Sequence, residues 1–401
     1  MTVHKTISKR YGAFCLHQVR DPETIKRILD DPNGFVRPSY ILNMLQKAIG
    51  HSLLSLEGHE WRNMRQTMAD VFTPDFVQRK VVSNINDVVS RQLSSWYDGD
   101  VINIEEQMRF IGIGIISKTV FSSDMTSGQA QNFMQAVDTI MRISEPGVHR
   151  YIPKALGLTR NVSFPPLSHA QKKAISDIDN IILPIIDRRL NLDSMAIQND
   201  DLLARLIGAH HGEGLQPLSR AQIRDQILLF TVAGHETLAG VLTFAFNDIL
   251  QQPDVLKKMR DDTHNYCARV MLEALRLHPP ASFMLREASL STQFNHASFE
   301  KGDLVLIDFE SLHRDPDYWL DPEHFQPDRF QDIKTLRPHF IPFSRGPKVC
   351  IGRSMSMVEG TTVLREVIQN FDLKPQEFLK GKTSGMTKRP QGRLIASVRR
   401  R

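Results

Sequence analysis

The chain has 401 residues, of which 41% are hydrophobic and 24% charged, a composition that can bury a large core and excludes a disordered or fibrous protein. Its net charge of +5 is too small and too scattered to predict a nucleic-acid-binding surface. No linker, charge block or internal repeat divides the sequence, so residues 1–401 are predicted to form a single domain.

The first strand is predicted in residues 11–19, and Thr73 with Pro74 opens a predicted helix over residues 75–93. Gly112 and Gly114 lack the third glycine and the preceding strand that a dinucleotide-binding loop requires, so that interpretation is rejected.

The second half of the chain begins with two capped helices. Ser168 opens a helix over residues 170–190, and Ser219 forms a capping box before a helix that should continue to Gln252, where Pro253 stops it. At 1.5 Å per residue, this second helix would be roughly 50 Å long. Residues 297–309 predict strands of a minor sheet on either side of a turn at Lys301, Gly302 and Asp303. The predicted fold class is therefore mainly α with a minor β-sheet region (α+β).

The stretch from Leu228 to Phe246, LLFTVAGHETLAGVLTFAF, is long and apolar enough to span a membrane. Its centre is polar, which would be costly in lipid, so a core helix is favoured. Taken alone, the polar centre suggests only a kink whose polar groups are satisfied.

The spacing of the cysteines and the composition of the N-terminal residues indicate the cellular compartment of the protein. Cys15, Cys267 and Cys350 lie far apart and form no CxxC pair, which argues against a disulfide framework or a zinc site and favours a reducing compartment. The first residues, MTVHKTISKRYG, contain no apolar core of signal-peptide length. We therefore expect a cytoplasmic protein with no membrane anchor.

The segment FIPFSRGPKVCIGRSMSMVEG delivers Cys350 to the entrance of a predicted helix. Free backbone N–H groups and the helix dipole there favour a thiolate over a thiol. Gly352 would let a flat ligand lie close, and Phe343 could shield the sulfur from water. A lone cysteine is more often a buried structural residue, but these neighbours favour a thiolate beneath a planar metal cofactor.

Phe343, Gly346, Cys350 and Gly352 reproduce the pattern FxxGxxxCxG, which resembles the haem-binding signature of the cytochrome P450 family. Further family-like motifs occur in the family's order: WRNMR with Trp61 and Arg65, AGHET from Ala233 to Thr237, EALR from Glu273 to Arg276, and FQPDRF with Arg329. The resemblance implies a cytochrome P450-like fold with haem b (iron protoporphyrin IX) between the long helix and the helix after Cys350, the iron ligand.

The same resemblance implies roles for the other residues. The haem propionates would be bound by Trp61, Arg65, Arg286 and Lys348. Lys348 departs from the usual arginine or histidine, and it cannot make a bidentate contact. Glu273, Arg276 and Arg329 would support the cysteine loop. The three-residue spacing of Glu273 and Arg276 also suits a weak surface ion pair, but apolar neighbours predict burial.

For the AGHET motif, the Thr237 hydroxyl is expected to donate to the Ala233 carbonyl, loosen the helix and open a groove for water. Gly234 would make room for dioxygen, Glu236 would relay protons through water, and Thr237 would hold the dioxygen as it is protonated. His235 is interpreted as a polar helix residue rather than an iron ligand.

The function implied is a monooxygenase that oxidises a small lipophilic substrate in secondary metabolism. Electrons are expected from a separate ferredoxin or flavodoxin with its reductase, and the protein is expected to be a monomer. Alternatives are a peroxide-driven or non-oxygenating haem-thiolate enzyme and a non-enzymatic haem sensor.

The resemblance also implies where the substrate and the partner would bind. The walls of the substrate pocket are predicted from residues 37–56, 141–164 and 384–386 with Phe230, Val232, Phe283 and Met284. The partner-binding face is predicted from Arg62, Arg345, Lys348 and Arg353.

Overall fold

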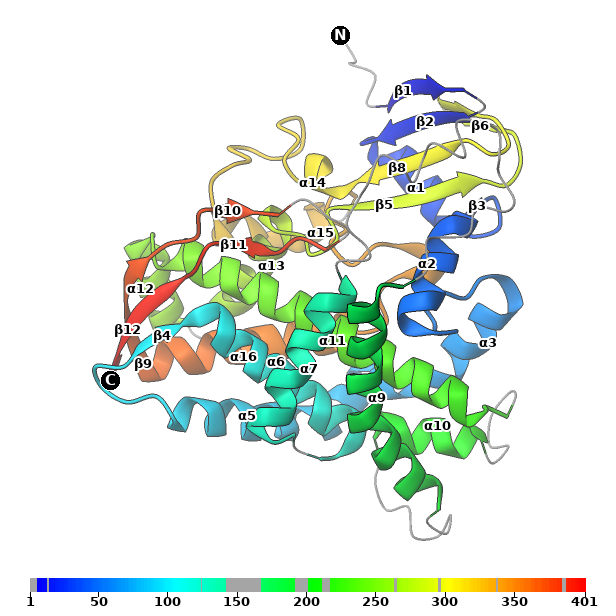
Figure 1. Cartoon of the computed structure of the whole chain (residues 1–401). Helices are drawn as coiled ribbons and strands as arrows, with labels where there is room; N and C mark the ends of the chain where they lie inside the picture. Colours follow the sequence, from blue (N-terminus) through cyan, green and yellow to red (C-terminus); the bar gives the residue numbers. More distant parts are fainter. Residues whose placement is uncertain are drawn as a thin grey trace.

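The computed structural model describes residues 6–12, 14–123, 125–141, 167–191, 201–210, 217–262, 265–294, 297–336, 338–383 and 387–401. Helices make up most of this part of the chain, and the largest sheet lies on one side of them (Figure 1). The predicted class, mainly α with a minor β-sheet region, is confirmed.

The longer helices are α1 (Pro22–Asp30), α2 (Ser39–Ile49), α3 (Gly58–Met68), α5 (Val82–Ser94), α6 (Ile104–Phe121), α7 (Ser127–Met141), α9 (His169–Leu190), α10 (Leu202–His210), α11 (Arg220–Ile249), α12 (Pro253–Asp261), α13 (Asn265–Leu277) and α16 (Arg353–Asn370). Short turns of helix are η1 (Ala69–Phe72), α4 (Pro74–Phe76), η2 (Val77–Val81), α14 (Phe309–Leu312), η6 (Pro327–Asp332), α15 (Ile333–Leu336) and η7 (Gly346–Lys348).

The strands are β1 (Thr6–Tyr11), β2 (Phe14–Val19), β3 (Phe35–Val36), β4 (Val101–Asn103), β5 (Phe283–Ala288), β6 (Thr292–Phe294), β7 (Ala297–Phe299), β8 (Leu304–Asp308), β9 (Phe371–Glu377), β10 (Gly381–Lys382), β11 (Pro390–Gln391) and β12 (Ile395–Arg400). The largest sheet has the order β1-β2-β8-β5-β3. Its β2–β8 pair is parallel, with Leu16 opposite Leu304, and its other pairs are antiparallel.

Two strand predictions needed correction. Residues 11–19 do not form one strand, because Gly12 has φ +56 and turns the chain between β1 and β2. Residues 297–309 form two strands of different sheets: β7 pairs with β6, while β8 pairs with β2 and β5. Gly302, with φ +92, makes the turn between them.

Helix starts were predicted better than helix ends. Both capping boxes are present, at Ser168 before α9 and at Ser219 before α11. However, α11 ends at Ile249 rather than Gln252, because Gln252 is already the cap of α12 and Pro253 is that helix's first residue. The predicted helix over residues 75–93 contains a π-helical segment, η2, before α5.

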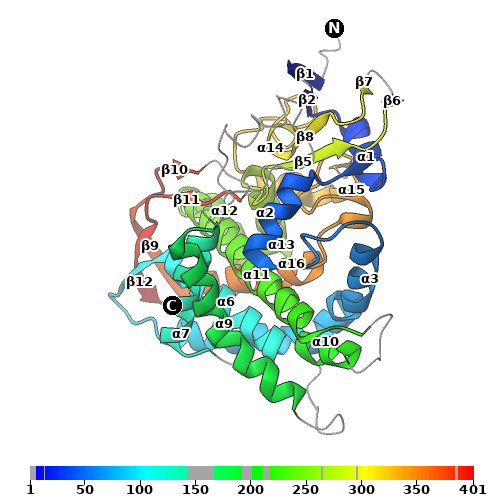
Figure 2. The same ribbon diagram turned by 45° about the vertical axis from the view of Figure 1, so that its right-hand side comes forward.

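Helix α11 lies at the centre of the helical part of the molecule. Figure 2 shows it running from α10 at one end to α12 at the other. It is the one described helix that is long and apolar enough to span a membrane, but 78% of its most apolar window is buried within the protein. The expectation of a core helix is confirmed.

Helix α6 packs along α11, and its Gly112 sits at the crossing. A Cβ on Gly112 would lie 3.2 Å from the His235 carbonyl oxygen. This glycine therefore permits close helix packing, which agrees with the rejection of a dinucleotide-binding loop.

Candidate functional site

Cys350 lies at the entrance of α16, two residues before the N-cap Gly352. Its backbone N–H donates to the Phe343 carbonyl at 2.9 Å, which closes the loop. Gly346 has φ +70, and a Cβ there would lie 2.3 Å from the Leu29 carbonyl oxygen of α1, so glycine is required. By contrast, a Cβ on Gly352 would meet no atom within 4 Å. The loop is thus pressed against α1 at Gly346 and open beside Gly352.

Burial and the nearby positive groups act in opposite directions on the Cys350 thiol. Burial raises the pKa of Cys350, and this effect exceeds the lowering by the Gly352 N–H and by the cations of Arg65 and Arg353. The helix entrance alone therefore does not favour the thiolate, because moving an anion out of water costs more than these groups restore. Yet Cys350 is exposed. A metal ion that reached its sulfur would deprotonate the thiol.

Helix α3 carries Trp61 and Arg65. Trp61 is buried, and the Lys348 ammonium lies 5.5 Å from the centroid of its ring. Burial lowers the pKa of Arg65, and the charge of Cys350 raises it. Arg65 makes no hydrogen bond or ion pair with the described residues. Its guanidinium is therefore available to an anion close to the sulfur.

Arg37, Glu57, Arg286 and Lys348 form a second group of charges, which we call the four-charge cluster. The Glu57 carboxylate accepts from Arg37 at 3.3 Å and from the Lys348 ammonium. Burial, followed by the charge of Arg37, lowers the pKa of Lys348 to about 8. The contact with Glu57 means that Lys348 is not held for a propionate alone.

Arg286 is the least satisfied member of the four-charge cluster. Arg286 is 4% exposed, and its Nη1 donates to the adjacent Leu285 carbonyl at 2.9 Å. Burial, followed by the charge of Arg37, lowers its pKa to about 9. Within the described residues, three cations of the cluster thus share one carboxylate.

These residues fit haem. The accessible sulfur can provide one iron ligand, and no atom within 4 Å of a Cβ on Gly352 would obstruct a ring there. The under-satisfied buried cations match carboxylates that the ring would bring. In the described part of the chain, no three His, Cys, Asp or Glu side chains gather as a metal site. A cofactor that supplies the remaining ligands of its own metal is therefore suited to this site.

The centre of α11 opens on one side. Ala233 is exposed although most of the helix is buried, and the Thr237 hydroxyl donates to its carbonyl at 2.8 Å, as expected. The helix nevertheless remains regular from Arg220 to Ile249, so this hydrogen bond does not break it. His235 is fully buried, and its Nδ1 lies 2.9 Å from the Thr231 carbonyl. It is held as a core residue.

Gly234 has a different neighbour from the one expected. A Cβ there would lie 2.6 Å from Cδ1 of Ile116 on α6. The missing side chain therefore accommodates packing between α6 and α11, rather than simply leaving room for dioxygen.

Glu236 is held by arginines. Its Oε1 forms an ion pair with Nε of Arg389 at 3.0 Å, and its Oε2 lies 3.8 Å from Arg109. Asp138 bridges the same arginines, at 2.9 Å from Arg109 and 3.2 Å from Arg389. Glu236 is therefore not simply a free carboxylate at the centre of α11, although its Oε2 has no hydrogen-bond partner among the described residues.

Glu273, Arg276 and Arg329 meet where α13 packs against η6. Both Glu273 and Arg276 are fully buried, with Nε–Oε2 and Nη2–Oε1 distances of 2.7 and 2.8 Å. Arg329 donates to the same carboxylate at 3.0 Å. The remaining Arg276 donors bind the carbonyls of His313, Pro322 and His324. The structure thus brings these motif residues together as a buried network.

The predicted substrate pocket is only partly covered by the structure. Residues 142–164 and 384–386 lie outside the described residues. Phe283 and Met284 are half-buried in β5, and Val232 belongs to the core. Phe230 stacks on Phe72 with ring centroids 5.0 Å apart.

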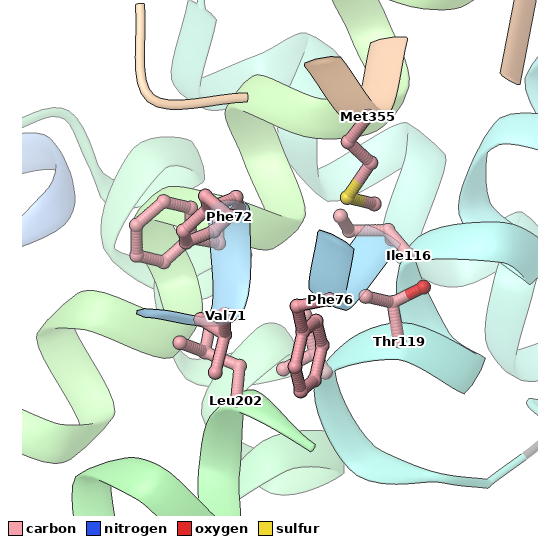
Figure 3. A pocket seen from close by; sticks show the side chains of 9 residues that line it. Val71, Phe72, Phe76, Ile116, Thr119, Leu202 and Met355 are labelled. Atoms are coloured by element: carbon pink, nitrogen blue, oxygen red, sulfur yellow. The ribbon is translucent and has the colours of Figure 1, made fainter. Parts of the chain in front are cut away.

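Phe230 also lines a small cavity. Figure 3 shows apolar side chains around it, and Thr119 turns a methyl carbon toward Phe76 and its oxygen away. The lining residues are Val71, Phe72, Phe76, Ile116, Thr119, Val120, Leu202, Phe230 and Met355. The space admits only about one molecule the size of water, so it is too small for the lipophilic substrate.

Three of the four residues of the predicted partner-binding face remain accessible to solvent. Arg62 and Arg353 are exposed. Arg345 pairs with Asp30 at 3.1 Å but its side chain is 37% exposed, whereas Lys348 points inward to Glu57. The carboxylates that hold Arg345 and Lys348 lie far away in the sequence. These partners cannot be identified from the residues next to the two cations.

Sequence reasoning missed Glu57, Arg109, Asp138 and Arg389, and it placed Arg37 only in an apolar pocket wall. No local motif marks these residues. A general signal was available, since charged residues beside apolar segments need partners when they are buried.

Comparisons with known proteins agree with this geometry. The family model described as Cytochrome P450 matches residues 12–392. A cyclooctat-9-en-7-ol 5-monooxygenase of Streptomyces melanosporofaciens is 23% identical, over 92% of this chain and 82% of the relative. A bifunctional cytochrome P450/NADPH–P450 reductase of Alternaria alternata is 26% identical, over 98% of this chain and 37% of the relative. The solved haem domain of cytochrome P450DA superposes with a TM-score of 0.82 at 21% identity, covering 99% of this chain and 89% of that one.

Proposed function

The chain belongs to the cytochrome P450 family, and from this premise we propose that it inserts one atom of dioxygen into a C–H or C=C bond of a lipophilic organic substrate. It is a haem-containing oxidoreductase that incorporates oxygen, as its monooxygenase relative indicates. The observation that carries the proposal is the accessible Cys350 sulfur near buried cations that have too few carboxylate partners.

We assign the cofactor as haem b, with Cys350 as the iron ligand. Trp61, Arg65, Arg286 and Lys348 would hold its carboxylates. Phe343, Gly346 and Gly352 would shape the loop beneath it. When bound, the haem supplies the activation of dioxygen.

The chain's own residues would then manage protons. The Thr237 hydroxyl donates to the Ala233 carbonyl, which leaves the lone pairs of its oxygen available to a water on the open side of α11. The Oε2 of Glu236 can take up and release a proton through water. Arg389 would position this carboxylate through Oε1. Gly234 keeps α6 close to this segment through its contact with Ile116.

The finer assignments also remain proposals. A lipophilic cyclic substrate is supported by the name of the Streptomyces relative, which oxidises cyclooctat-9-en-7-ol. A role in secondary metabolism is part of the same proposal. Electrons would come from a ferredoxin or flavodoxin with its reductase, attracted by Arg62 and Arg353. We further propose that the protein is cytoplasmic and monomeric. A single domain is supported by one core cluster that extends from Met44 to Val398.

The haem assignment is tested by replacing the sulfur. Cys350→Ala should abolish the red-shifted spectrum of the reduced carbon monoxide complex, because that spectrum requires a thiolate ligand. Cys15→Ala provides the matched control and should retain it. Retention of the spectrum by Cys350→Ala would remove Cys350 as the ligand.

The oxygen-handling assignment is tested by Thr237→Ala. This variant should consume electrons at a similar rate but divert more oxygen to hydrogen peroxide, measured as peroxide per electron pair. Thr243→Ala is a suitable control, since that buried hydroxyl also donates to the carbonyl four residues earlier. Turnover with a surrogate redox pair, with and without dioxygen, distinguishes monooxygenation from a peroxide-driven or non-oxygenating enzyme and from a sensor.

A further inference from the structure

Glu57 is the carboxylate at the centre of the four-charge cluster. It is the N-cap residue of α3, but its side chain does not cap the helix. The carboxylate is directed instead to Arg37, at 3.3 Å, and to the Lys348 ammonium. The side chains of Arg37 and Lys348 are 11% and 5% exposed, so water screens these charges weakly.

The charge of the cluster can be compared with that of its proposed ligand. Arg37, Arg286 and Lys348 carry three positive charges, and Glu57 carries one negative charge, so the cluster has two positive charges, to which Arg65 of α3 adds a third. Haem b carries two carboxylates. Without Glu57, the positive excess over these carboxylates would rise from one charge to two.

We propose that Glu57 is a charge-balancing residue of the cofactor site, which restrains Arg37 and Lys348 and lowers the reduction potential of the bound haem. This inference rests on the proposed function, because it requires haem in the site. Glu57 acts through its neighbours, and it is therefore a positioning residue rather than a catalytic residue.

The direction of the effect follows from electrostatics. A buried negative charge stabilises the oxidised, more positive iron relative to the reduced iron. Neutralising Glu57 should therefore favour reduction. At an effective dielectric constant of about 20, removing one partly buried charge from the cofactor site is expected to change the ratio of reduced to oxidised protein on the order of tenfold. For one electron, tenfold corresponds to about 59 mV.

The experiment measures the midpoint potential of haem-loaded protein by spectroelectrochemistry. Glu57→Gln should shift the potential to a more positive value. Glu60→Gln is the matched control, because Glu60 is an exposed carboxylate on the same helix, and it should shift the potential far less. Lys348→Gln should shift it to a more negative value, and the double variant should lie near the wild type.

A second readout separates charge balance from a structural role. Transfer of haem to apomyoglobin should be slower from Glu57→Gln than from wild type, since Arg37 and Lys348 become free to bind the cofactor carboxylates. Faster haem loss with an unchanged potential would show that Glu57 is only a structural ion-pair partner and would overturn the inference. Wild-type protein that takes up no haem would overturn the proposed function as well.

Discussion

Two buried groups of arginines in this molecule differ in how fully their donors are used. In the network of Glu273, Arg276 and Arg329, all five N–H donors of Arg276 have acceptors. In the four-charge cluster, Arg286 is almost as deeply buried, but its hydrogen bond to Leu285 uses only one donor. Burial is shared by both groups, so burial alone does not identify a ligand site.

The difference has a physical explanation. A buried guanidinium with every donor satisfied is an internal cross-link, and it needs nothing from outside the chain. A buried guanidinium with unused donors is unfavourable until an anion arrives. We therefore interpret the Glu273 network as scaffold for the cysteine loop and the four-charge cluster as a binding site.

The largest expected effect comes from breaking the satisfied network. Glu273→Gln leaves Arg276 and Arg329 without their carboxylate, and it should lower the free energy of unfolding by about 3–5 kcal/mol. Urea denaturation of the haem-free protein measures this change. Glu60→Gln, at an exposed position, should stay within about 0.5 kcal/mol of wild type. A similarly small change for Glu273→Gln would contradict the scaffold role.

The opposite result is expected in the four-charge cluster. Arg286→Leu should weaken haem binding by about 1.5–3 kcal/mol, the value of a hydrogen bond to a charged group. The same variant should not destabilise the haem-free protein, because it removes a buried cation that lacks an anion. Haem titration and urea denaturation measure the two quantities. Loss of stability without loss of haem affinity would reverse our assignment of the two groups.

The satisfied network should also produce acid sensitivity. Burial, followed by the charge of Arg276, lowers the pKa of His313 to about 3. Its Nε2 accepts from the Ile341 N–H at 3.1 Å, so the neutral ring is part of the fold. Because the unfolded chain takes up this proton first as the pH falls, stability should decrease below the ordinary histidine pKa of about 6.5.

At pH 5.5, this histidine should cost roughly 1.4 kcal/mol relative to neutral pH. His313→Gln should remove that part of the pH dependence, which is obtained by subtracting the two denaturation profiles between pH 7 and pH 4. Parallel profiles for variant and wild type would show that His313 does not contribute.

The smallest effect on stability is expected at the ion pair between Arg389 and Glu236 of α11. Arg389→Gln removes the 3.0 Å contact to Glu236, but the Arg389 side chain is 27% exposed and Arg109 remains nearby. Its cost should therefore be about 1 kcal/mol or less. A larger loss would place this pair with the satisfied scaffold rather than with the solvent-screened ion pairs.

Much of the fold was readable from local patterns. The capping boxes at Ser168 and Ser219 predicted two helix starts, because a cap depends on residues only three positions apart. Helix ends and strand pairing were less predictable. The end of α11 depends on the start of α12, and the partners of β7 and β8 lie in different sheets.

By itself, the sequence determined the family, the mainly helical class and the positions of Cys350, the Glu273 network and the AGHET segment, because each is encoded by a short spacing. The tertiary structure alone decided that Lys348 meets Glu57, that Glu236 meets Arg389, and that Gly234 packs on Ile116. These partners lie far apart in the chain, and only the packing of whole elements brings their charges and side chains into contact.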